Sequence, residues 1–187
     1  QQFRGEINIV NSTFADNTVV NSNSNKDQAV IYMDYAYDGP SVNVLNSIIS
    51  HAANYTIAQS NNYAMTLSIE NSYVSGGTAN VAMETNGTKS YGTTNVNSGL
   101  YFEDAANGDY SLSDVSTLLG AGSSTATVGG VSITAPTTDF YGDPRSNPAG
   151  SNPDMGAIES LDSIANVGLA AVVTNNGFCE TASGAIT

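Results

Sequence analysis

The chain has 187 residues, with 17 acidic and 4 basic side chains and a net charge of -13. This charge argues against binding to DNA, RNA or an anionic membrane, because those partners need a basic patch that neutralises phosphate groups. Asn, Ser and Thr account for 63 residues and hydrophobic residues for 40%, a composition typical of a folded β-protein rather than of a disordered chain.

A motif recurs in the first hundred residues. It reads apolar, small polar, apolar, any residue, Asn, Ser, any residue, apolar, and it occurs at residues 7–14, 42–49 and 67–74, with a degenerate copy at 94–98. The alternation at the start of each copy predicts a β-strand. The Asn-Ser pair predicts a sharp corner, because Asn tolerates left-handed backbone geometry. The apolar residues after the corner are expected to point back inward (Phe14, Ile49 and Val74).

A strand, a corner and a second strand form one coil of a parallel β-solenoid, and their recurrence predicts that fold. In such a stack the equivalent asparagines Asn11, Asn46 and Asn71 are expected to form a hydrogen-bonded ladder. The alternative is a β-sandwich with similar strands. Sandwich hairpins, however, need turns about every 8 to 12 residues and share no corner motif.

The segment between the first two copies contains a candidate site. Asp34 and Asp38 resemble a catalytic carboxylate pair, but along an extended strand they lie about 13 Å apart. Glycoside hydrolysis needs about 5 to 9.5 Å. With Tyr35 and Tyr37 between them, the two acids instead suit stacking and hydroxyl recognition of a sugar, so all four residues form a candidate glycan-binding site. The alternative is a solvated loop.

Other side chains give weaker signals. His51 has no Cys or His partner in its motif and is predicted to be a surface residue rather than a metal ligand. Calcium would suit so acidic a chain, yet no EF-hand loop or calcium-binding nonapeptide occurs. We therefore predict no cofactor, assign no metal site and assign no catalytic residue. A lyase would have to draw its cation from four residues (Arg4, Lys26, Lys89 and Arg145).

From about residue 96 the pattern changes. Four motifs follow in order: Gly-Asp-Tyr-Ser-Leu (108–112), Ser-Thr-Leu-Leu-Gly-Ala-Gly (116–122), Asp-Phe-Tyr-Gly-Asp-Pro-Arg (139–145) and Asp-Met-Gly-Ala-Ile-Glu (154–159). Together they resemble the C-terminal end of secreted bacterial right-handed parallel β-helix proteins of the pectate-lyase-like superfamily, and the resemblance covers residues 5–160.

The resemblance implies an all-β fold, a right-handed parallel β-helix (solenoid) over residues 1–160, in which about 96–160 form a C-terminal closing segment. It implies no single activity, because the superfamily contains lyases, hydrolases, adhesins and other surface proteins. Within the segment we expect a charge network that caps the open end of the solenoid. The alternative for this network is an ion or substrate site. Its members are Asp139, Arg145, Asp154 and Glu159.

Residues 161–187 differ again. An apolar run at 167–173 is followed by a turn and by the lone Cys179, and residues 181–187 resemble the opening of a β-sandwich repeat in surface proteins of gliding bacteria. We expect a β-sandwich-like module, or a linker, to begin here. The chain would then be a piece of a longer protein, with the partner of Cys179 beyond residue 187.

These features predict a non-catalytic extracellular scaffold or adhesion module of a large bacterial surface protein, in contact with glycans or other surface proteins. The expected location is extracellular or at the cell surface, without membrane insertion, since no apolar run approaches the roughly 18 residues of a span. The alternative is a fragment of a polysaccharide lyase or glycoside hydrolase that acts on an acidic polysaccharide, with catalytic coils upstream of residue 1.

Overall fold

The computed structural model describes residues 5–17, 29–33, 39–50, 55–59 and 62–160. Across these residues the chain is all-β, and its helical content is limited to two 3-10 turns at Gly77–Asn80 and Ala105–Asn107. Neither of these described helices has the length and apolar character that a membrane crossing requires.

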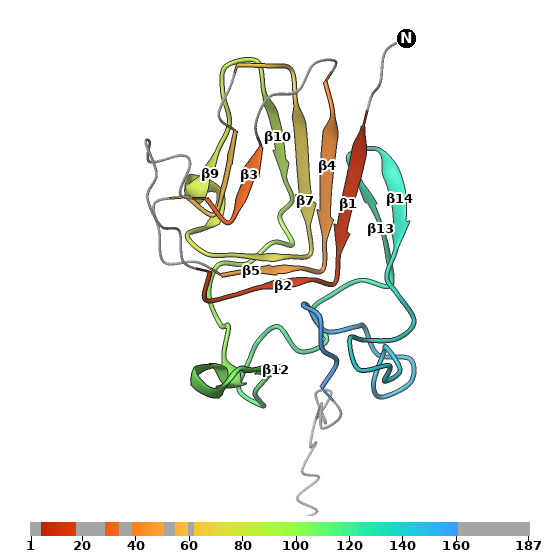
Figure 1. Cartoon of the computed structure of the whole chain (residues 1–187). Coiled ribbons are helices and arrows are strands. Elements are labelled where there is room, and N and C mark those ends of the chain that lie inside the picture. Colours follow the sequence, from red (N-terminus) through yellow and green to blue (C-terminus); the bar gives the residue numbers. More distant parts are fainter. Residues whose placement is uncertain (1–4, 18–28, 34–38, 51–54, 60–61, 161–187) are drawn as a thin grey trace, which may run out of the picture.

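Ten short strands stack into three parallel sheets (Figure 1). The first sheet has the order β1 (Glu6–Val10), β4 (Ser41–Leu45), β7 (Thr66–Glu70) and β10 (Thr88–Tyr91). The second has β2 (Thr13–Phe14), β5 (Ile48–Ile49) and β8 (Tyr73–Val74), and the third has β3 (Ile31–Met33), β6 (Ile57–Gln59) and β9 (Val81–Ala82).

The chain thus visits the three sheets in the same order three times, and each visit adds one parallel strand to every sheet. We call each visit a winding. A fourth winding begins with β10 and continues to Val96, which pairs in parallel with Tyr73. The structure therefore has the stacked parallel strands that the repeated motif predicts.

The motif also determines the register of the first sheet. Val42 lies opposite Ile7 on one side and Leu67 on the other. Because alternate residues of a strand share a face, these apolar rows point into the space between the three sheets. Ten buried residues form the core there: Met33, Val42, Val44, Ile49, Ile57, Met65, Leu67, Ile69, Val74 and Val81. A buried side chain of this size contributes about 1.5–3 kcal/mol relative to an exposed one.

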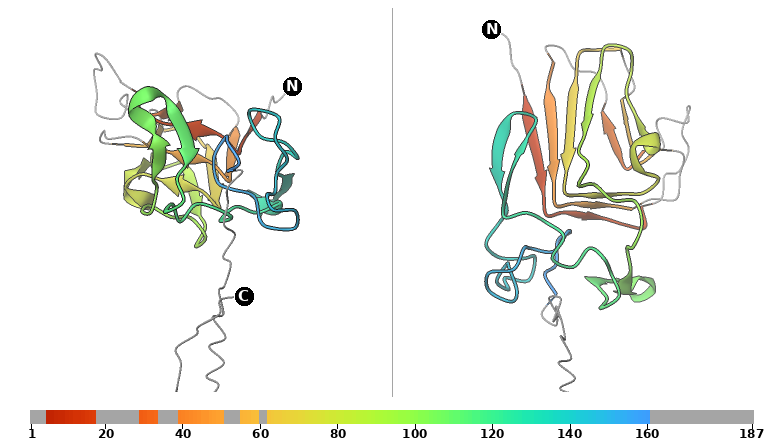
Figure 2. Two further views of the ribbon diagram at one scale, coloured as in Figure 1. Left: turned by 90° about the horizontal axis from the view of Figure 1, so that it is seen from below. Right: turned by 180° about the vertical axis from the view of Figure 1, so that it is seen from behind.

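The closing segment, residues 96–160, covers the outer faces of the first two sheets (Figures 1 and 2). It contains two antiparallel pairs, β11 (Phe102–Asp104) with β12 (Asp109–Leu112) and β13 (Thr125–Val128) with β14 (Val131–Thr134).

Two outward-facing side chains of the second winding explain where the closing segment lies. Val128 and Ile133 pack on Leu45, and Leu118 and Met155 pack on Ile48. The resemblance predicted that this segment closes the end of the stack. The structure places it along the side, because Leu45 and Ile48 form an apolar surface on the outside of the corner that must be removed from water.

Candidate functional site

Each Asn-Ser corner turns through a left-handed residue. The φ angle is 43° at Asn11, 51° at Asn46 and 46° at Asn71. Residues other than glycine rarely adopt this region, and Asn does so at the lowest cost. The prediction of a sharp corner at these three positions is confirmed.

Serine hydroxyls accept backbone hydrogen bonds between windings at this corner. The Ser12 N–H donates to Ser47 Oγ at 3.2 Å, and the Ser47 N–H donates to Ser72 Oγ at 3.1 Å. In the fourth winding Asn95 takes the place of serine, since its Oδ1 accepts from the Ser72 N–H at 2.9 Å. Each of the three serine hydroxyls also donates to the carbonyl two residues before it. The hydroxyl row thus runs through the first three windings, and the Asn95 amide continues it into the fourth.

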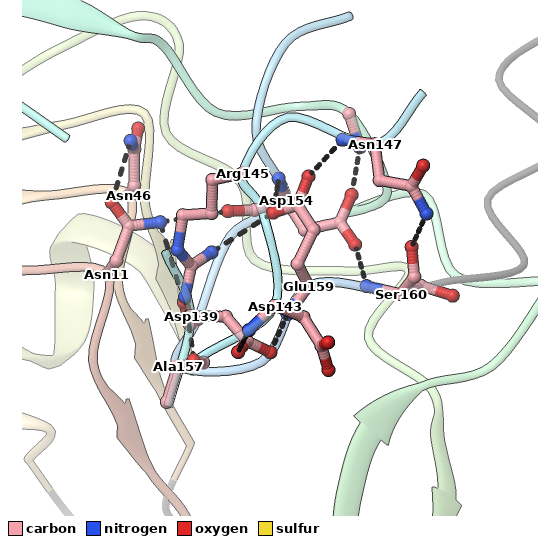
Figure 3. Close-up of polar contacts among 12 residues, drawn as sticks. Asn11, Asn46, Asp139, Asp143, Arg145, Asn147, Asp154, Ala157, Glu159 and Ser160 are labelled. Atoms are coloured by element: carbon pink, nitrogen blue, oxygen red, sulfur yellow. Dashed lines mark hydrogen bonds and ion pairs between the residues drawn. The ribbon is translucent and has the colours of Figure 1, made fainter. Parts of the chain in front are cut away.

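The predicted asparagine ladder is shorter. Asn46 Nδ2 donates to Asn11 Oδ1 at 3.2 Å, which joins two of the three asparagines (Figure 3). At the third position, the Asn71 N–H donates to Thr94 Oγ1 at 3.0 Å, and within the described residues its side chain has no bond to Asn46. The ladder therefore links the first two windings and is not continued to the third.

The two joined asparagines also hold the closing segment. Asn46 Nδ2 donates to the Ser123 carbonyl at 2.8 Å, and Asn46 Oδ1 accepts from the Ser123 N–H at 2.9 Å. Asn11 Nδ2 donates to the Asp154 carbonyl at 3.1 Å. These side chains consequently connect the corner of the stack to residues that are 77 and 143 positions away in the sequence.

The four predicted network residues come together inside the closing segment (Figure 3). Arg145 Nη1 lies 3.1 Å from Glu159 Oε2, and the two side chains are only 3% and 0% exposed. Arg145 Nη2 donates to the Ala157 carbonyl at 2.6 Å. Asp139 and Asp154 act on the guanidinium through their charge. The guanidinium thus lies among three carboxylates.

Backbone N–H groups satisfy most of the carboxylate oxygens. Asp139 accepts from three N–H groups, those of Tyr141, Asp143 and Glu159, at 2.8 to 3.0 Å. Asp154 accepts from Gly120 and Ser160, and Glu159 accepts from Asn147 and Asp154. Such bonds to ionised acceptors are stronger than neutral ones, so they tie residues 120–160 into one unit.

Burial and these donors act on the acids in opposite directions. Desolvation raises the pKa of Asp154 and of Glu159 above the usual carboxyl values, although the N–H donors and Arg145 lower it. Desolvation also raises the pKa of Asp139, but its three N–H donors and Arg145 outweigh this, so the pKa of Asp139 lies below its usual value. Asp139 is therefore the acid of the network best suited to carry a full negative charge.

The network differs from a metal centre in the groups that its carboxylate oxygens bind. Its carboxylate oxygens already accept hydrogen bonds from peptide groups and from one guanidinium. In the part of the chain that the structure describes, no group of three or more His, Cys, Asp or Glu side chains has the arrangement of a metal site. The arrangement can neutralise charge and fix the backbone of residues 139–160.

Several predicted residues fall outside the described ranges. The candidate glycan site and the proposed β-sandwich start therefore stay predictions. The residues concerned are Arg4, Lys26, Asp34, Tyr35, Tyr37, Asp38, His51, Cys179 and the range 161–187.

Lys89 has a structural role that its sequence position alone did not assign to it. In the structure Lys89 lies opposite Leu67, at the inward-facing position of the last strand of the first sheet. Its Nζ donates to the carbonyls of Thr78 and Val81 at 2.9 and 2.8 Å, and desolvation lowers its pKa. A long side chain with a polar tip suits β10, which has no further strand beside it within the described residues. The sequence could have indicated this inward position of Lys89, because the equivalent positions in the earlier strands are apolar.

Replacing Ser47 with alanine should lower the free energy of unfolding by about 1–3 kcal/mol, because the Ser12 N–H loses its buried acceptor. Urea denaturation followed by circular dichroism measures this loss. The matched control is Ser90→Ala, on the exposed side of β10, which should change stability by no more than about 0.5 kcal/mol. Equal losses for the two variants would show that the hydroxyl row does not stabilise the stack.

No protein-family model matches the chain, and comparisons with curated proteins and with solved structures also found no match. The resemblance to right-handed β-helix proteins therefore stays a prediction.

Proposed function

We propose that the chain folds as a right-handed parallel β-helix and serves as a non-catalytic scaffold or adhesion module of a large extracellular bacterial surface protein. Three visits to three parallel sheets, with apolar rows pointing between them, support the helical path. Open solenoids of this kind are rods that present long surfaces to partners.

The observation that carries the proposal is the attachment of the closing segment to the corner of the stack. The Gly156 N–H donates to the Asn46 carbonyl at 2.7 Å, and the Ala157 N–H donates to Thr13 Oγ1 at 2.9 Å. With the bonds of Asn11 and Asn46, these contacts hold the first two windings to the segment at several points. Such an arrangement resists separation of the windings, as a load-bearing module requires.

The placement of the charged groups agrees with a structural role. The carboxylates of Asp139, Asp154 and Glu159 bind peptide N–H groups of their own segment. The amine of Lys89 binds two peptide carbonyls. In a lyase or hydrolase, acids and cations must instead meet the substrate.

A polysaccharide screen tests the proposal. The purified chain is incubated with polygalacturonate, alginate and neutral glucans, with calcium and with chelator, and new reducing ends and unsaturated uronates are measured against a heat-denatured sample. We expect no product from any of these polysaccharides. Product release from an acidic polysaccharide would overturn the proposal in favour of a lyase or hydrolase, and Lys89→Met would then test Lys89 as its cation.

A further inference from the structure

Two aromatic side chains project into water from the turn at residues 139–143 of the closing segment. Phe140 is 76% exposed and Tyr141 is 70% exposed. Their rings make an edge-to-face contact, with centroids 5.2 Å apart and planes inclined by 75°. Two exposed rings in contact form a small apolar patch, and such patches often mark a binding site.

The backbone that carries these rings is held firmly. Asp139 Oδ1 accepts from the N–H groups of Tyr141 and Asp143, and the Asp139 N–H donates back to the Asp143 carbonyl at 2.9 Å. The Phe140 N–H donates to the Ala157 carbonyl at 2.9 Å, and the Gly142 N–H donates to the Asp139 carbonyl at 3.2 Å. A ligand that binds the rings would therefore pay little conformational entropy for ordering the turn.

Polar groups lie in the same turn. Within the described structure, neither the Tyr141 hydroxyl nor the Asp143 carboxylate takes part in a hydrogen bond, and the Asp143 side chain is partly exposed. The turn thus offers apolar ring faces together with one hydroxyl and one carboxylate. This combination fits a molecule that has both a C–H face and hydroxyl groups.

We propose that Phe140, Tyr141 and Asp143 form a binding site for a neutral carbohydrate. A pyranose ring stacks its C–H face on an aromatic ring. Its hydroxyl groups donate to the Asp143 carboxylate and exchange hydrogen bonds with Tyr141 Oη. The inference rests on the proposed adhesion function, and it names the binding site and the class of ligand for that function.

Size and charge favour a sugar over the other partners. At their exposure, the two side chains offer roughly 200–400 Å², whereas each partner of a stable protein interface contributes about 800 Å². The pair is therefore too small for a protein by itself and matches one or two sugar rings. The net charge of -13 and the neighbouring Asp143 disfavour uronates and sulfated sugars.

Native affinity electrophoresis tests the site with the full chain. Gels contain laminarin, xyloglucan, galactomannan or, as the acidic comparison, polygalacturonate, and retardation relative to a gel without polysaccharide gives the association constant. We expect at least one neutral polysaccharide to retard the chain. Phe140→Ala and Tyr141→Ala should each weaken binding at least about fivefold, and Tyr141→Phe should weaken it less than Tyr141→Ala.

The matched control is Tyr101→Ala, which removes a different exposed ring, 55% accessible. It should leave retardation unchanged. All variants should keep the wild-type melting temperature, because the rings lie in water. Full retardation of the Phe140→Ala/Tyr141→Ala double variant would overturn this site and leave the adhesion proposal standing. Retardation of the wild type by no neutral polysaccharide, or only by polygalacturonate, would overturn the neutral ligand. The scaffold proposal has its own test in the degradation assay.

Discussion

Replacing Arg145 with methionine should lower the free energy of unfolding by about 3–5 kcal/mol, the loss expected when one partner of a buried ion pair is removed. Methionine retains most of the apolar stem, so the change isolates the charge. Without the guanidinium, Glu159 and Asp154 remain buried, and only peptide N–H groups are left to bind them. Urea denaturation at neutral pH measures the loss.

The loss should depend on pH. Desolvation raises the folded-state pKa of Glu159 above its ordinary value of 4.5, and Arg145 opposes this. In Arg145→Met the pKa of Glu159 rises further. A group with a raised folded pKa contributes stability below its unfolded pKa, and this contribution disappears as the pH rises through the folded pKa. The difference between variant and wild type should therefore be largest at neutral pH and should shrink as the pH falls towards 4.5.

The control is Arg145→Met combined with Glu159→Gln, which removes both charges at similar volume. This double variant should recover part of the lost stability at neutral pH, and its difference from the wild type should depend less on pH. A loss in Arg145→Met that stays the same from neutral pH to pH 4.5 would contradict the charge explanation and indicate a packing defect.

Replacing Asn46 with alanine should cost about 2–4 kcal/mol, from broken buried hydrogen bonds and from a left-handed backbone that alanine tolerates poorly. Asn46 is completely buried and makes three side-chain bonds, one to Asn11 and two to Ser123. Denaturant unfolding gives the total loss. Amide hydrogen exchange at Ser123 should accelerate, because its N–H loses its acceptor.

Two companion variants separate the causes. Asn46→Gly accepts the left-handed backbone, so it isolates the lost bonds. Asn71→Ala changes the same corner conformation, φ 46°, at a side chain that does not bind the closing segment. Asn46→Ala should therefore be less stable than Asn71→Ala by at least about 1 kcal/mol. Equal losses would mean that the bridge to Ser123 contributes nothing.

The stacked strands could be predicted because they are local and repeated. Val42 and Leu67 hold the same place in two copies of the motif, and the structure puts them opposite each other. The corner could be predicted for the same reason. The hydroxyl row could not be predicted, because both Asn and Ser recur at every corner, and their recurrence alone does not tell which of them bonds across windings.

No repeated motif in the sequence predicted that the closing segment packs along the side of the stack. The alternation of the motif places Leu45 and Ile48 on the outer side, opposite in face to Val44 and Ile49. Nothing near them in the sequence, however, indicates that Val128 and Met155 cover them. The members of the charge network were identifiable, since charged residues are only 11% of the chain. Their principal partners were not, because peptide N–H groups are common to almost every residue and leave no pattern in the sequence.

The bond between Asn11 and residue 154 has a consequence for biosynthesis. Its two ends are separated by 143 residues, and Thr13 finds its partner Ala157 only 144 residues later. At about 5–20 residues per second, roughly 7 to 30 s of translation separate them. During that time the outer corner of the first winding stays hydrated on the nascent chain. The contacts of this winding with the closing segment thus form only when the ribosome has passed residue 157.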